Sequence, residues 1–301
     1  MPSAAPSFAD DMALIPGGRF MMGSDNFYPE EAPARPAEVA PFLMDRHLVT
    51  NAQFATFVAA TGYVTLAERA PDPKLYPDML PERAIPGSSV FVRPEKDGKP
   101  FGPETWWQFR AGANWRAPYG PNSGVNVPED HPVVQIAFED AAAFAAWAGK
   151  RLPTEEETEF AARGGLDGVD YAWGKALAPD GAELANIWLR GFPFERGRPG
   201  PPYTTPVGSY PVNAYGLYDL IGNVWEWTSS DADAAPGAKS CCGADVKSLA
   251  PSHRKILKGG SHLCAPSYCR RYRPAAIWPQ PIDTSTTHVG FRCARDVEPK
   301  T

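Results

Sequence analysis

Apolar side chains recur at helical spacing in three segments of the chain, and the first of these carries clear start and stop signals. Thr50 and Gln53 form a capping-box pattern, in which each side chain can bond the backbone N–H of the other residue. Gly62 stands where the left-handed residue that ends a helix belongs. The sequence therefore predicts a helix between Thr50 and Gly62, with an apolar face made by Phe54, Phe57 and Val58.

Two further helices are predicted in the middle of the chain. Residues 138–148 are rich in alanine, carry aromatic side chains at Phe138 and Trp147, and end at Gly149. The next helix starts at Thr154, whose partner Glu157 gives a second capping box, and it stops at Gly164-Gly165. No convincing helical pattern follows, so most of the second half of the chain is expected to lack helix.

Strand patterns are short and separated by long irregular stretches. Residues 12–22 are typical of two strands around a Pro-Gly-Gly turn, and residues 42–45 and 131–136 are each typical of one strand. Residues 66–129 show no sustained periodicity, and residues 230–254 are small and polar, as in an exposed loop. Regular structure is therefore expected to be a minor part of the fold.

Composition agrees with this pattern. The 301 residues include 34 Pro and 27 Gly, which interrupt regular structure because Pro lacks an N–H donor and Gly costs backbone entropy. They also include 9 Trp and 11 Tyr, and 43% of residues are hydrophobic, so the chain can bury a core. We expect one irregular, loop-rich α+β domain over residues 12–301, after a disordered lead-in at residues 1–11.

Charge and hydropathy narrow the class of protein. The net charge of −6 disfavours binding to a nucleic-acid backbone, which needs clustered Lys and Arg. No apolar run approaches the roughly 18 residues that a membrane helix requires. The N-terminal segment has no basic region before an apolar stretch, so no secretory signal is expected. We therefore expect a cytoplasmic protein that binds neither nucleic acid nor membrane, and a monomer.

The five cysteines do not suggest a disulfide framework, because their number is odd and no secretion signal is expected. Cys264 and Cys269 lie close together before an arginine-rich segment that favours the thiolate form. Two thiolates suit Cu(I) better than zinc, which normally takes four ligands, but on spacing alone buried structural thiols or an incidental disulfide are the favoured interpretation. Cys241 and Cys242 are expected to be free thiols, and Cys293 to fill a core position.

The segment YGLYDLIGNVWEW offers oxygen ligands for a hard cation. Ca²⁺ takes six to eight oxygens, and two carboxylates around a tight turn with backbone carbonyls could supply several of them. The candidate ligands are Asp219, Gly222, Val224 and Glu226. The alternative is a turn in which the Asp caps the backbone and the Glu is solvated. Trp225 and Trp227 alternate with polar positions, as in a half-buried strand.

Several of these motifs occur in order and together resemble one known family. They are MALIPGGRFMMGS, FLMDRHLVTNAQFATFV, HPVVQIAFEDAAAFAAWAGKRLPTEEE, YGLYDLIGNVWEW, KGGSHLCAPSYCRRYRPAA and HVGFRC. Over residues 12–295 the chain resembles the formylglycine-generating enzymes, or sulfatase-modifying factors. The resemblance implies a C-type-lectin-like fold with little regular structure. It also implies copper-dependent oxidation by O₂ of a cysteine in a CxPxR-type motif, within an unfolded or nascent sulfatase polypeptide, to Cα-formylglycine.

The resemblance assigns site residues one by one. It places Cu(I) between Cys264 and Cys269, and it implies Ca²⁺ at the Asp219–Glu226 turn. It also implies a second Ca²⁺ site that starts at Asn186 and Ile187, but residues 197–203 read GRPGPPY and lack the expected Asp, which puts that site in doubt. The surroundings of the copper site would be Ser261, Trp225, Ser267, Tyr268 and Arg271, with Ser261 and Trp225 near O₂ or the substrate thiol.

The sequence departs from the family pattern at two further places. Thr158 replaces a Trp of the third predicted helix, and Ser230–Ala234 replaces an aromatic stretch. Both departures lie outside the cysteine pair, so they bear on stability or substrate docking more than on metal chemistry. Because the substrate would be an extended peptide, we expect an open groove beside Cys269.

Three other functions remain open on the sequence. The chain could be a non-catalytic lectin-like binding module, because fold alone does not imply activity. It could be a relative of the non-heme iron sulfoxide synthases, although it lacks their HxxxHxE spacing and added helical domain. Finally, the Cys264–Cys269 pair could be a disulfide staple with a purely structural role.

Overall fold

The computed structural model describes residues 11–77, 79–96, 102–196, 200–201, 203–232 and 253–298. Most of the lead-in expected at residues 1–11 lies outside these ranges. Asp11 is described, and its carbonyl accepts a hydrogen bond from Arg46 N at 3.0 Å while its carboxylate pairs with Arg46 Nε at 3.0 Å. No helix among the described residues is long and apolar enough to cross a membrane.

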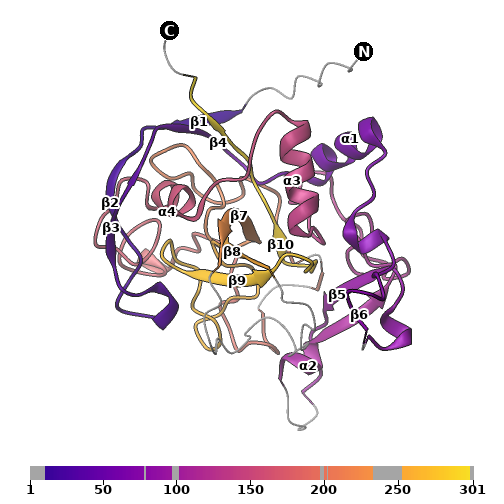
Figure 1. The fold of residues 1–301 in the computed structure, drawn as a ribbon. Coiled ribbons are helices and arrows are strands. Elements are labelled where there is room, and N and C mark those ends of the chain that lie inside the picture. Colours follow the sequence, from indigo (N-terminus) through magenta and orange to yellow (C-terminus); the bar gives the residue numbers. More distant parts are fainter. Residues whose placement is uncertain are drawn as a thin grey trace.

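Two small sheets lie at the centre and at one end of the fold (Figure 1). The central sheet has the strand order β10-β7-β8-β9, with β10 parallel to β7 and the other pairs antiparallel. Its strands are β7 (Trp225–Asp231), β8 (Arg254–Lys258), β9 (Ile277–Pro281) and β10 (Val289–Gly290). The antiparallel second sheet joins both ends of the chain through β1 (Met12–Ile15), β4 (Phe42–Asp45) and β11 (Ala294–Asp296).

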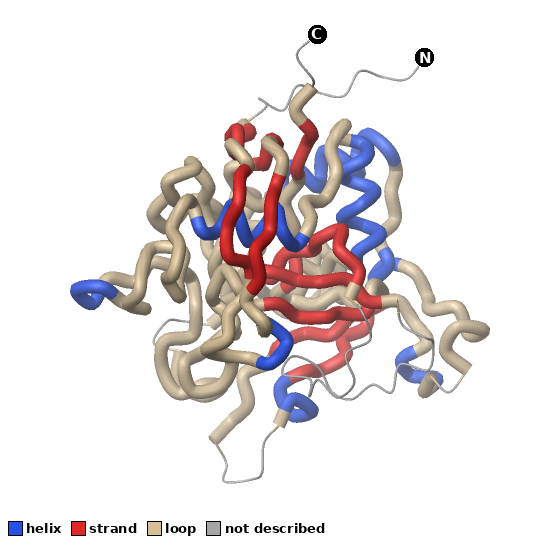
Figure 2. Tube along the Cα trace, turned by 60° about the vertical axis from the view of Figure 1, so that its left-hand side comes forward, coloured by secondary structure: helices blue, strands red, loops and turns tan. Residues whose placement is uncertain are grey.

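Two antiparallel pairs of strands flank the central sheet. One consists of β2 (Gly18–Met22) and β3 (Arg35–Val39), and the other of β5 (Gly87–Phe91) and β6 (Trp107–Ala111). One-turn α2 (Pro103–Trp106) lies between the two strands of the second pair, in the stretch where no periodicity was found. These strands are too short to leave a clear repeat in the sequence. Loops make up most of the remaining trace (Figure 2).

The three helices form where the sequence predicts them. They are α1 (Asn51–Thr61), α3 (Phe138–Trp147) and α4 (Glu155–Arg163). Both predicted capping boxes are present, at Thr50 with Gln53 and at Thr154 with Glu157. Gly62 and Gly164 adopt the left-handed conformation at the C-terminal ends. Thr158, where the family resemblance expects Trp, is buried, and its hydroxyl donates a hydrogen bond to Thr154 O at 2.8 Å.

One of the strand predictions needs correction. Residues 131–136 are not a strand: Pro132 makes an isolated bridge to Thr50, and Gln135 has a φ of 62°, outside extended geometry. The apolar side chains of this segment are nevertheless buried in the core. The two strands within residues 12–22 exist, but β1 pairs with β4 and β2 pairs with β3, so they do not pair with each other.

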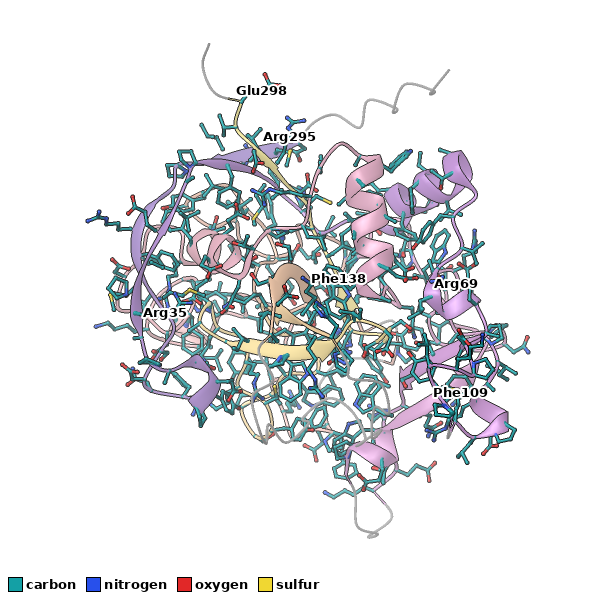
Figure 3. All side chains as sticks on the ribbon, in the orientation of Figure 1. Arg35, Arg69, Phe109, Phe138, Arg295 and Glu298 are labelled. Carbon is teal, nitrogen blue, oxygen red and sulfur yellow. The ribbon has the colours of Figure 1, made fainter. Side chains whose placement is uncertain are left out.

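Side chains fill the space between the elements (Figure 3), and the largest of the fully buried ones are aromatic. Trp188, Trp225 and Trp227 are fully buried. Phe138 of α3, labelled in Figure 3, packs edge-to-face on Trp227 with ring centroids 5.9 Å apart, which fixes α3 against the central sheet. The alternation at Trp225 and Trp227 therefore marks a strand buried on both faces rather than a half-buried one.

A buried charge cluster joins the β2–β3 pair, α4 and the central sheet. Glu159 of α4 accepts from Lys258 Nζ at 2.9 Å, from Arg163 Nη2 at 2.7 Å and from Gly23 N at 2.8 Å. Burial raises the pKa of this carboxyl, but the two cations outweigh it and hold the pKa below its ordinary value of 4.5. The cluster therefore stabilises the fold at neutral pH, and that contribution is lost as the pH falls below 4.5 through the folded-state pKa.

Replacing Lys258→Met should lower the free energy of unfolding by about 3 kcal/mol, because Glu159 loses one of its two buried cationic partners. Urea unfolding at pH 7 measures this change. The matched control is Arg19→Met, which breaks an exposed ion pair with Glu38 and should change stability by less than about 1 kcal/mol. Equal stability of the two variants would contradict the role given to the buried cluster.

Candidate active site

Cys264 and Cys269 lie in the loop between β8 and β9, with their sulfurs 3.3 Å apart. The loop folds as successive turns, in which Cys264 N donates to Ser261 O at 2.9 Å and Cys269 N to Ala265 O at 2.9 Å. Each cysteine is 1% exposed, and neither is in a disulfide. The predicted pair is therefore brought together as two free, buried thiols.

Glycine is required where this loop begins. Gly260 has a φ of 72°, and a Cβ there would lie 2.6 Å from Arg271 O. This close approach brings the start and the end of the cysteine loop together. The GG dipeptide of the motif thus closes the loop whose interior holds the two thiols.

Three of the predicted surrounding residues reach the cysteines. Ser261 is buried, and its Oγ accepts a hydrogen bond from Leu263 N at 3.2 Å. The backbone N–H of Ser261 donates to Cys264 Sγ at 3.5 Å. Arg271 places Nη1 3.9 Å from Cys269 Sγ, while Glu30 binds the same guanidinium. Tyr268 lines the pocket at the two thiols.

Two other predicted residues are placed differently. Ser267 is exposed and does not line the pocket beside the cysteines. Trp225 is fully buried in β7 and does not line the pocket either. Its backbone N–H donates to His288 O at 2.8 Å. Its indole Nε1 is buried without a hydrogen-bond partner among the described residues.

The pocket beside the thiols is small and aromatic. It offers about 10 Å³, room for hardly more than one water molecule. Its lining comprises Ser261, Leu263, Cys264, Tyr268 and Cys269 from the loop, together with Trp106, Trp107 and Phe192. The prediction of an open groove beside Cys269 is therefore wrong. The aromatic rings close the site, with Phe192 stacked on Tyr268 at a centroid distance of 4.5 Å.

Two buried histidines lie near the cysteines, and sequence reasoning missed His288. Burial and the nearby Arg196 and His288 hold the pKa of His262 well below 6.5, and burial lowers the pKa of His288 to about 3. Both imidazoles are therefore neutral at pH 7. His262 Nδ1 is 2.7 Å from Asn223 O, and His288 packs against Trp107 with ring centroids 4.9 Å apart. His288 belongs to the HVGFRC motif, which was the available signal.

The predicted calcium turn brings two carboxylates into the interior. Asp219 accepts from Gly208 N at 2.6 Å through Oδ2, while Oδ1 is buried without a hydrogen-bond partner among the described residues. Glu226 is fully buried and bound by Arg292 through both oxygens, at 2.7 and 3.0 Å. The solvated Glu of the alternative interpretation is thus excluded. One guanidinium against two carboxylates leaves a negative charge that a hard cation at Asp219 would balance.

At Asn186 and Ile187 the structure shows a different arrangement. Asn186 Oδ1 accepts from Arg196 Nη2 at 2.9 Å, so a guanidinium lies where the resemblance expects a second Ca²⁺. Ile187 is buried in the core. Within the described ranges, no group of three His, Cys, Asp or Glu residues is arranged to hold a metal ion.

A family model described as the sulfatase-modifying factor enzyme 1-like domain matches residues 1–297. The chain belongs to this family. It is 50% identical over 294 residues to the formylglycine-generating enzyme of Mycobacterium tuberculosis, covering 95% of this chain and 98% of that one. It is also 38% identical over 296 residues to a Mus musculus protein named inactive C-alpha-formylglycine-generating enzyme 2, covering 95% and 86%.

Structural comparison agrees with the family. The structure of PvdO from Pseudomonas aeruginosa matches with a TM-score of 0.58 and 22% sequence identity, covering 95% of this chain and 94% of that one. The predicted loop-rich α+β fold of the sulfatase-modifying factor family is therefore confirmed. Because one relative is named as an active enzyme and another as inactive, activity has to be argued from the site itself.

Thiol counting tests the arrangement of the cysteines. In a Cys241→Ser/Cys242→Ser background, no thiol should react rapidly with a thiol reagent under anaerobic native conditions, because Cys264, Cys269 and Cys293 are all buried. Cys293 should be the most inert, since burial and Asp45 raise its pKa well above 9.0. After unfolding, three thiols should react. A count of one after unfolding would instead show a Cys264–Cys269 disulfide. Rapid native reaction would contradict the closed pocket.

Proposed function

We propose that this protein oxidises a cysteine of a sulfatase to formylglycine, using Cu(I) held by Cys264 and Cys269 and O₂ as co-substrate. The observation that carries the proposal is the pair of buried cysteine sulfurs, 3.3 Å apart and not joined in a disulfide, in a chain 50% identical to a formylglycine-generating enzyme. The paired thiols favour the catalytic interpretation over the non-catalytic one, for which the inactive relative is the precedent.

The donor set fits Cu(I). Soft thiolates select soft metals, and two of them leave a coordination position for a third ligand. Copper bound here would supply the one-electron chemistry by which O₂ is activated. The nearby Arg271 favours the anionic form of Cys269, and Glu30 holds that guanidinium in place.

The remaining residues of the site control access and hydrogen bonding. Trp106, Trp107 and Phe192 exclude water from the thiols, which protects a reactive intermediate from side reactions. Ser261 accepts a hydrogen bond from Leu263 N, so its own O–H can point into the pocket and donate to O₂ or to the substrate thiol.

The proposed substrate segment is a CxPxR-type motif in an unfolded or nascent polypeptide. Since the pocket holds hardly more than one water, a peptide cysteine has to displace aromatic side chains to reach the pair. Phe192 and Tyr268 are the suitable residues, because they are only partly buried and stack on each other at the pocket wall. A cytoplasmic monomer would meet this segment before the target folds.

We also propose that Ca²⁺ binds at the Asp219 turn. The unpartnered Asp219 Oδ1 and the carbonyls of Gly222 and Val224 are oxygen donors of the kind that Ca²⁺ prefers. Glu226 would contribute while it remains bound to Arg292. The role of this ion is structural, because the turn leads directly into β7 of the central sheet.

Mass spectrometry of a peptide containing CxPxR tests the proposed activity. Aerobic incubation with Cu(I)-loaded protein and reductant should convert the peptide cysteine to an aldehyde. Cys264→Ser should reduce conversion to the level without protein, because one sulfur ligand is lost. Cys293→Ala is the matched control, since it removes a buried thiol outside the pair and should retain conversion.

A copper chelator should also stop the reaction. Conversion that persists in Cys264→Ser, or that survives removal of copper, would contradict the proposed site. Absence of both conversion and copper binding in the unmodified protein would favour the non-catalytic binding module.

A further inference from the structure

One of the places where this chain departs from the family pattern is the segment to which the resemblance assigns a second calcium site. Arg196 is 6% exposed, and its Nη2 donates to Asn186 Oδ1 at 2.9 Å and to Tyr203 O at 2.6 Å. The guanidinium also lies over the rings of Tyr203 and Trp188, at 4.9 and 5.8 Å from their centroids. An organic cation thus binds the side-chain oxygen of Asn186, where the resemblance places the start of a second metal site, together with the carbonyl of Tyr203.

The chemistry of these oxygens suits the guanidinium and not Ca²⁺. Both acceptors are neutral, one an amide and one a backbone carbonyl, and residues 197–203 contain no Asp or Glu. Ca²⁺ sites normally include carboxylates, and a divalent ion beside a buried guanidinium would be repelled. Arginine matches neutral acceptors with a single positive charge and directed N–H groups.

We infer that Arg196 is a built-in replacement for the second calcium ion, and that it positions the segment that supports Cys264. Arg196 binds the side chain of Asn186, and the backbone carbonyl of Asn186 accepts a hydrogen bond from Asn223 N at 2.9 Å. Two residues further on, Trp188 N donates to Cys264 O at 2.8 Å. Arg196 is therefore connected to the backbone of a proposed copper ligand through one short stretch of chain.

This arrangement differs from a metal site in its response to solution conditions. A guanidinium stays protonated throughout the pH range in which proteins fold, and no chelator removes it. The segment around Asn186 should therefore hold its geometry without added calcium. This inference does not depend on the proposed oxidation of a sulfatase cysteine, and its tests do not measure activity.

The first test is the number of calcium ions bound per chain after dialysis against Ca²⁺, measured by elemental analysis. One ion is expected, and Asp219→Asn should remove it while Arg196 remains in place. Two tightly bound ions in the unmodified protein would overturn the inference. A count of zero would contradict the proposed calcium turn but agree with the role of Arg196, so the two failures are distinguishable.

The second test replaces the guanidinium. Arg196→Met should lower the melting temperature by about 5 °C, equally with Ca²⁺ and with chelator, because Asn186 Oδ1 loses its buried donor and Tyr203 O keeps only Asn186 Nδ2. The matched control is Arg190→Met, an exposed arginine of the same segment, which should have little effect. An unchanged melting temperature in Arg196→Met would overturn the inference.

Alkylation separates positioning from general loss of stability. In the Cys241→Ser/Cys242→Ser background, Arg196→Met should speed native alkylation of Cys264 and Cys269 by about ten-fold, while Cys293 stays protected. Peptide mapping identifies the modified cysteine. Equal acceleration at all three thiols would show a purely global effect and would contradict the positioning role.

Discussion

The candidate site depends on the hydrogen bonds around one fully buried residue, Asn223. Its carbonyl accepts from His262 N at 3.0 Å and its N–H donates to Asn186 O at 2.9 Å. Its side chain exchanges hydrogen bonds with the backbone of Thr205, at 3.0 and 3.2 Å. These contacts join the calcium turn, the cysteine loop and the Asn186 segment, which have no sheet ladder to satisfy their buried backbone groups.

The buried charged side chains around the site are also paired individually, each cation with its own acceptor. Arg292 binds Glu226 beneath the calcium turn, and Arg271 binds Glu30 beside the thiols. Arg196 binds the neutral oxygens of Asn186 and Tyr203. Each of these buried cations thus has a defined partner, and the two neighbouring thiols supply the soft ligands that the proposed copper would need.

The sequence predicted what local interactions determine and missed what distant contacts determine. Helices α1 and α4 were predicted because their capping boxes lie within four residues. Residues 131–136 were misjudged because their apolar side chains are buried in the core without pairing in a sheet, and burial alone gives the same apolar run as a strand. Spacing alone could not show that Cys264 and Cys269 meet, and the family resemblance supplied that expectation. Arg196 gave no signal beyond the missing acidic residues, and the closed pocket depends on aromatic rings from three separate segments.

X-ray absorption at the copper edge tests the central claim most directly. The sample is protein loaded anaerobically with one equivalent of Cu(I), with Cys241 and Cys242 replaced by serine. The proposed site predicts two sulfur neighbours per copper, and loss of copper in the Cys264→Ser/Cys269→Ser variant. Coordination by nitrogen or oxygen alone, or copper retained by the double variant, would contradict it.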